Sequence, residues 1–194
     1  MKTREAWLDE ATKDLTGWVV KCKAASLFPS PYVSIGFPKG GKGTKNTAIG
    51  QCWDKKASAD QLCAHIFVSP TLSDAVEVLS TLLHELIHAS VGTQCGHRGA
   101  FRRVALELGF MAPMTSTPYG DELKQRLMFL SQWLGPYPHS ALKKQVRGSV
   151  GSRMVKMMCP DCGYIARTTA KWLNLNGAVQ CPCNGHSMDV ETSL

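Results

Sequence analysis

The chain lacks any apolar run long enough to cross a bilayer. No stretch of about 18 consecutive apolar residues occurs in its sequence, which argues against a membrane-spanning helix. Residues 1–5 include charged side chains and are not followed by the apolar segment of a secretory signal peptide. We therefore expect a cytoplasmic protein without a membrane partner. In that compartment its eight cysteines favour metal binding or free thiols over disulfides.

Acidic side chains are also in short supply. Lys and Arg together number 22 against 15 for Asp and Glu, so the formal net charge is +7. A basic excess favours an acidic partner, nucleic acid first. The length of 194 residues and the hydrophobic content of 44% allow one good core with a smaller appendage. The oligomeric state is not readable, and a monomer is the default.

A complete phosphate-binding loop is missing as well. Residues 38–46 are rich in Gly and Lys, but Gly43 follows Lys42 where G-x-x-x-x-G-K-[ST] requires Ser or Thr. We interpret this segment as a basic hairpin tip, able to touch a DNA backbone, and not as a nucleotide site.

The central motif of the sequence is H-E-x-x-H at residues 84–88, inside an apolar run with helical periodicity. Residues four apart share one face of a helix, so His84 and His88 can direct both imidazoles at one ion. Glu85 would lie close enough to orient and deprotonate a water molecule held by that ion. The alternative, a core helix with two packed histidines, would bury three polar groups without a partner, which is costly.

A hydrolytic zinc site needs a third protein ligand and an open position for water. The downstream candidates are Cys95 and His97. We favour His97, because thiolates are commoner in structural zinc sites and three neutral imidazoles leave the metal a stronger Lewis acid. An apolar-periodic run follows at 101–108, so we expect His97 in the first turn of a second helix.

The surrounding patterns predict an α+β domain. We expect an N-terminal helix over residues 3–25 with Thr3 as its N-cap, and a motif helix over 72–89 begun by a capping box of Thr71 with Asp74. We expect substrate to bind by strand addition along residues 65–69. Alternating β-rich segments predict three strands, at 32–37, 48–53 and 64–69.

The C-terminal region has the spacing of a second metal site. Cys159 and Cys162 form a C-x-x-C pair, and Cys181 and Cys183 follow after 18 residues. The pattern is close to a zinc ribbon, one residue short in its second pair. Four thiolates leave no open position, so we expect a structural Zn²⁺ that stabilises a segment too short for a large core. His186 is the alternative to Cys183 as the fourth ligand.

Basic and aromatic side chains accompany this second site. We interpret them as candidate nucleic-acid contacts, through phosphate neutralisation and base stacking. The alternatives without nucleic-acid contact are a solvated linker over residues 140–153 and a small sheet with Trp172 as its core. The candidate residues are Lys143, Lys144, Arg147, Arg153, Arg167, Lys171 and Trp172.

The first site resembles that of the SprT-like (Spartan-type) metalloproteases. That family has H-E-x-x-H followed by a third His in an H-G-x-x-F setting, matched here by residues 84–88 and 97–101. Arg98 stands where the family usually has Gly. In the tail, Asn184 stands where family ribbons commonly have Gly. The likeness covers roughly residues 5–112 and is specific at the metal site and loose elsewhere.

The resemblance implies a compact zincin-like protease domain at 1–112 and a zinc ribbon at 156–194. The leucine spacing and basic residues between them predict a helix and a basic linker at 113–155. It implies a zinc metallopeptidase with one catalytic and one structural Zn²⁺, protein substrates and Glu85 as general base. Some members cut proteins crosslinked to DNA, so we expect association with DNA or the nucleoid and a role in DNA repair.

Three questions stay open at the level of sequence. A non-proteolytic zinc-ribbon protein that binds nucleic acid would carry the same tail, and another zinc hydrolase, such as an amidase, would carry the same motif. The residue that stabilises the oxyanion is not evident, and Arg98, Tyr119 and His65 are the candidates considered.

Overall fold

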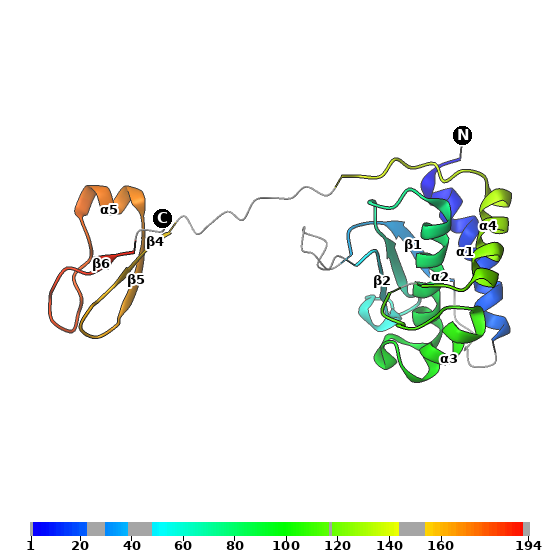
Figure 1. Ribbon diagram of the computed structural model, residues 1–194, viewed down its shortest axis with the longest axis horizontal. Coiled ribbons are helices and arrows are strands. Elements are labelled where there is room, and N and C mark those ends of the chain that lie inside the picture. The colour runs from blue at the N-terminus through cyan, green and yellow to red at the C-terminus, as the bar shows by residue number, and fades with distance from the viewer. Residues whose placement is uncertain (1, 23–29, 39–47, 117, 144–153, 192–194) are drawn as a thin grey trace. The chain divides into compact units, whose positions relative to one another are not determined.

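The computed structural model describes residues 2–22, 30–38, 48–116, 118–143 and 154–191 (Figure 1). The chain divides into two compact units, Met1–Gln145 and Val146–Leu194, each described here by itself. Both contain helices and small sheets, so the α+β class predicted from the sequence is confirmed. Among the described residues, no helix has the length and apolar character needed to span a membrane. Lys144, Arg147 and Arg153 lie outside the described residues, as does the predicted hairpin tip from residue 39 onward.

The first unit opens with helix α1, Arg4–Lys21. The Thr3 side chain accepts a hydrogen bond from the Ala6 N–H at 3.1 Å, which confirms the predicted N-cap. The helix buries one stripe of side chains at spacings of three and four residues: Trp7, Leu8, Ala11, Leu15 and Val19.

A three-stranded sheet follows, formed by β1 (Tyr32–Ile35), β2 (Gly50–Trp53) and β3 (His65–Val68). The strand order is β1-β3-β2, with β1 parallel and β2 antiparallel to β3. Because β3 is paired on both sides, the predicted strand addition along residues 65–69 is wrong. The edges of this sheet are β1 and β2.

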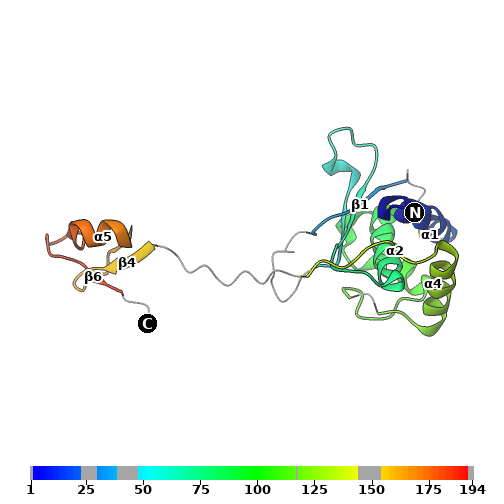
Figure 2. The same ribbon diagram turned by 90° about the horizontal axis from the view of Figure 1, so that it is seen from above.

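Helix α2, Ala75–Val91, lies at the centre of the first unit (Figure 2). It packs between the sheet and the helices α1 and α4, so its middle turns are buried on all sides. The Asp74 carboxylate accepts a hydrogen bond from the Glu77 N–H at 2.9 Å and is the N-cap. The predicted capping box with Thr71 is therefore wrong, because the Thr71 hydroxyl pairs with that of Ser69 instead.

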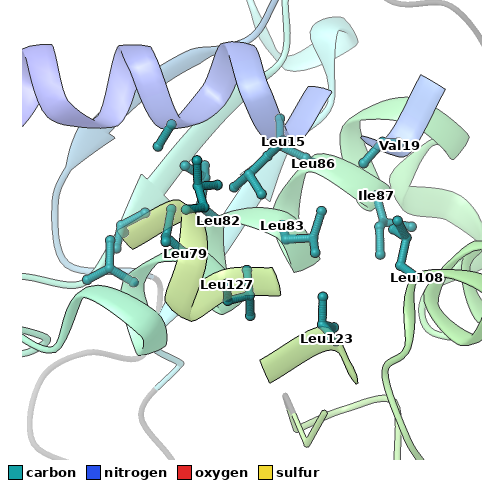
Figure 3. Close-up of a cluster of buried hydrophobic side chains, with 14 of the residues drawn as sticks. Leu15, Val19, Leu79, Leu82, Leu83, Leu86, Ile87, Leu108, Leu123 and Leu127 are labelled. Atoms are coloured by element: carbon teal, nitrogen blue, oxygen red, sulfur yellow. The ribbon is translucent and has the colours of Figure 1, made fainter. Parts of the chain in front are cut away.

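Two further helices complete the first unit, α3 (Gly99–Leu108) and α4 (Asp121–Leu134). Short 3₁₀ turns at η1 (Lys55–Ala57) and η2 (Thr93–Cys95) connect the elements. Leucines of α4 pack against α2 in the core shown in Figure 3, so the first unit extends past the expected boundary at residue 112. The leucines of this buried stripe are Leu123, Leu127, Leu130 and Leu134.

The second unit is a small antiparallel sheet with one short helix. The strands β4 (Met154–Met158), β5 (Ile165–Thr169) and β6 (Asp189–Val190) pair in the order β5-β4-β6, and α5 (Ala170–Asn176) follows β5. Its buried core is Met157, Cys159, Cys181 and Met188. Trp172 is 54% exposed, so its interpretation as the core of this sheet is wrong.

Candidate metal centres

The structure brings three imidazoles together in the first unit. His84 and His88 project from the same face of α2, and His97 lies in the turn just before α3, not inside its first turn as expected. The Nε2 atom of His97 is 3.0 Å from Nε2 of His84 and 3.2 Å from Nε2 of His88. Nitrogens about 2.0–2.1 Å from a tetrahedral ion lie roughly 3.3 Å apart, so this spacing fits a metal ion.

The chemistry of these imidazoles also fits a cation. Burial lowers the pKa of His84 to about 3 and that of His88 to about 4, with the neighbouring histidines acting in the same direction. Burial lowers the pKa of His97 as well. The three rings are therefore neutral near pH 7 and offer lone pairs that converge on one point, an arrangement that a bound cation stabilises.

The turn that carries His97 has an unusual backbone. Gly96 and Gly99 flank it with φ angles of +52° and +53°, in a region that residues with a Cβ rarely adopt. The Cys95 side chain, the rejected alternative ligand, donates to the Gly92 carbonyl at 3.3 Å and is not in the group of converging donor atoms.

Glu85 lies between α2 and strand β2. Its side chain is buried, which raises its pKa to about 8, while a hydrogen bond from the Cys52 backbone N–H acts in the opposite direction. Strand β2 passes so close that a Cβ built at Gly50 would lie 2.6 Å from Oε1 of Glu85. Glycine at position 50 therefore allows strand β2 to pass close to the Glu85 carboxylate. The sequence pattern predicted a strand here but not this role of the glycine.

These groups line one cleft of about 600 Å³. Its walls come from β2, from the motif residues of α2, from the turn around His97 and from Thr115 and Ser116. Sequence patterns gave no signal for Thr115 and Ser116, which reach the cleft through the loop after α3. Among the described residues that line it, none is Arg98, Tyr119 or His65, the three candidates for the oxyanion role.

Four thiols converge in the second unit. The Sγ atoms of Cys159 and Cys183 are 3.9 Å apart, those of Cys162 and Cys181 3.5 Å, and those of Cys181 and Cys183 3.3 Å. Sulfurs about 2.3 Å from a tetrahedral ion lie roughly 3.8 Å apart, whereas a disulfide needs about 2.05 Å. All four cysteines are free, so the group fits a metal ion.

The two halves of this group are built alike. The Gly163 N–H donates to the Cys159 carbonyl at 3.0 Å, and the Gly185 N–H donates to the Cys181 carbonyl at 2.8 Å. The Cys162 backbone N–H lowers the pKa of the Cys159 thiol to about 7, whereas the neighbouring thiols raise the pKa of Cys183. A cation at the centre of the group would favour the thiolate form of all four. His186 is exposed and outside the converging group, with Nδ1 3.9 Å from Asp161.

The remaining candidate residues are placed on the surface. Lys143 is exposed near the end of the first unit, and Arg167, Lys171 and Trp172 are exposed on β5 and α5. The Lys171 ammonium lies 5.4 Å from the centre of the Trp172 ring.

No family model, curated protein or solved structure matches this chain. The fold and the two sites define it as an α+β protein whose described residues form one histidine group and one cysteine group, each able to hold a metal ion.

Proposed function

We propose that the protein is a zinc-dependent endopeptidase of the SprT-like kind, with a zincin-like first unit and a zinc-ribbon second unit. One observation carries the proposal: three neutral imidazole nitrogens converge beside a buried carboxylate in a single cleft. A structural site has no use for such a carboxylate, whereas hydrolysis requires a base at that place.

Zinc suits both groups of donors. Three histidines with one position left for water is the ligand set of a hydrolytic zinc, and four thiolates form a closed structural site. Soft sulfur ligands in tetrahedral arrangement select zinc over the hard cations, which prefer oxygen. Bound zinc would supply a polarised water and a Lewis acid for the scissile carbonyl.

Glu85 is the residue that moves the proton in this proposal. It accepts a proton from the attacking water and delivers it to the leaving nitrogen. Burial raises the pKa of Glu85, and a zinc ion held by the neighbouring histidines would lower it again and favour the carboxylate that accepts the proton. The Cys52 N–H and the close approach at Gly50 hold the carboxylate in place.

The substrate backbone is best placed along β2. The Ser69 N–H donates to the Ile49 carbonyl at 2.8 Å, and alternation along an antiparallel pair then turns the backbone groups of Gly50 and the Cys52 carbonyl away from β3. The Cys52 N–H also points away from β3 and donates to Glu85. An extended peptide added at this edge would run beside the cleft. We therefore transfer the expected strand addition from β3 to β2.

Proteins associated with or crosslinked to DNA are the proposed substrates. The net charge of +7 and the exposed basic and aromatic side chains of the second unit support this choice. The resemblance of the motif to SprT-like proteases points the same way.

The test is metal analysis with a proteolysis assay on wild type and on Glu85→Gln, with and without DNA. We expect two zinc ions in both proteins and a loss of cleavage of about 10²–10⁴-fold in the variant. Glu77→Gln is the matched control, because Glu77 is exposed in the first turn of the same helix. Undiminished cleavage by Glu85→Gln would rule the mechanism out.

A second candidate function is nucleic-acid binding without proteolysis. It is favoured by the exposure of Tyr164 and Trp172 at 50% and 54%, beside Arg167 and Lys171. Binding to single- and double-stranded DNA should then weaken steeply as salt rises. Absence of binding, or binding without a salt dependence, would remove the DNA claim from both functions.

A further inference from the structure

The outer face of the first sheet carries a row of rings. Strand register places Tyr32, His65 and Trp53 opposite one another on β1, β3 and β2, and their side chains point away from α2. The rings of Tyr32 and His65 are 5.2 Å apart, and Tyr32 and Trp53 are 56% and 42% exposed. Phe67, two residues after His65 on β3, lies on the same face in the next row.

This face is hollowed to about 600 Å³. A Cβ built at Gly36 would lie 2.8 Å from Cδ1 of Phe67, so the Phe67 ring lies across the glycine and forms a floor. Phe37, 58% exposed, and Trp53 stand at its sides. No Asp, Glu, Lys or Arg is among its described lining residues: Gly36, Phe37, Gln51, Trp53, Ala57, Ser58, His65 and Phe67.

Strand β2 separates this hollow from the metal cleft. Gly50 and Cys52 line the cleft, Trp53 lines the hollow, and Gln51 lines both. A peptide strand added to the edge of β2 would alternate in the same way, with successive side chains on opposite faces of the sheet. Side chains on the outer face would lie about 4.5–5.5 Å from those of β2, within contact of the Trp53 ring.

We propose that the hollow is a substrate subsite that receives a bulky apolar side chain, such as Leu, Phe or Trp, from the residue adjacent to the one that faces the cleft. This inference rests on the proposed function. It defines the substrate as an extended segment with an apolar residue next to the cleavage point. Such segments become exposed when a protein unfolds. Folded surfaces, which rarely offer such segments, would be spared.

The first arm of the test maps cleavage sites. Wild type, Trp53→Ala and Tyr32→Ala are each incubated with a mixture of reduced, carboxymethylated proteins, and the new termini are identified by mass spectrometry. We expect wild type and Tyr32→Ala to prefer a bulky apolar residue at one fixed position. Trp53→Ala should lose this preference, with kcat/KM on such sites reduced roughly tenfold or more. Tyr32 is the matched control because it belongs to the same row of rings but does not line the hollow.

The second arm measures binding without catalysis. The Glu85→Gln protein, with and without Trp53→Ala, is titrated with a short peptide in which every second residue is Leu, and with the same peptide carrying Gly instead. Zinc content and thermal melting establish that each variant is folded. We expect tighter binding of the Leu peptide, and a loss of that advantage on Trp53→Ala.

The two arms separate the subsite from the protease. If Trp53→Ala leaves the preference for a bulky apolar residue unchanged, or if Tyr32→Ala reduces that preference equally, the subsite is overturned and the proposed protease activity is retained. Leu-dependent binding to the Glu85→Gln protein that requires Trp53, together with a wild type that cuts no substrate, supports the binding site and overturns the protease. Equal binding of the Leu and Gly peptides overturns the subsite whichever way cleavage turns out.

Discussion

The two groups that could hold a metal ion differ in how they relate to the core beside them. The histidine group lies at the surface of a cluster of 26 buried apolar residues that needs none of the three ligands. In the described part of the second unit the buried cluster has four residues, and Cys159 and Cys181 are two of them. The first unit therefore has a large core that does not include its candidate ligands. The small core of the second unit is formed in part by the candidate ligands themselves.

Metal removal should expose this contrast most strongly. We expect a chelator to unfold Val146–Leu194 and to leave Met1–Gln145 folded, because a structural zinc contributes on the order of 10 kcal/mol to a small domain. Amide hydrogen exchange followed by mass spectrometry reports the two units separately. Loss of protection in α2 before β4 and β5 would contradict the comparison.

A cavity in the large core is the next effect in size. Leu82→Ala should lower the free energy of unfolding of the first unit by about 2–5 kcal/mol, because Leu82 is fully buried on α2. Denaturant titration measures this change. Leu106→Ala on α3 is the control, since Leu106 is 44% exposed and its loss should cost far less.

Gly50→Ala should separate catalysis from metal binding. The added methyl group would collide with Oε1 of Glu85 and with the Thr81 side chain, so we expect zinc to be retained and kcat to fall by roughly 10². Gly17→Ala is the control, because Gly17 lies in α1 with open space around it and Ala favours a helix. Normal turnover by Gly50→Ala would show that the carboxylate does not depend on β2.

The smallest effect concerns alkaline pH. Burial raises the pKa of Tyr137 to about 12, above the value near 10 of an unfolded chain. The folded state then holds a proton that the unfolded state loses, so the contribution to stability is complete below pH 10 and falls as pH rises from 10 to 12. Tyr137→Phe should be less sensitive over this range in thermal melts. A sensitivity equal to that of wild type would assign the effect to other groups.

The sequence predicted the parts of this structure that depend on local spacing. The N-terminal helix with Thr3 as its cap and the four-residue step from His84 to His88 both follow from spacing within a single helix. Likewise, the two cysteine pairs each form a local turn, so spacing alone indicated a group. Such features are encoded within a few residues.

What depends on long-range pairing could not be predicted in the same way. The central position of β3 follows from its partners on both sides. The paired residues lie 33 positions earlier in β1 and 12–18 positions earlier in β2, and alternation within β3 does not reveal this order. Thr115 and Ser116 reach the cleft through a loop without periodicity. Trp172 is exposed because Met157 and Met188 fill the small core, a competition that composition does not decide.

The short turn between α2 and α3 has a consequence for how an ion enters and leaves. Two of the three histidines belong to the buried central helix α2, but His97 lies in a short turn between Gly96 and Gly99. Glycine has no Cβ, so the backbone of this turn can rotate at little steric cost. Opening of this turn alone would detach one nitrogen while the other two keep their positions. If the three histidines hold an ion as proposed, its exchange rate should follow the local opening of this turn, and a stiffer turn should lengthen the ion's residence time without altering α2.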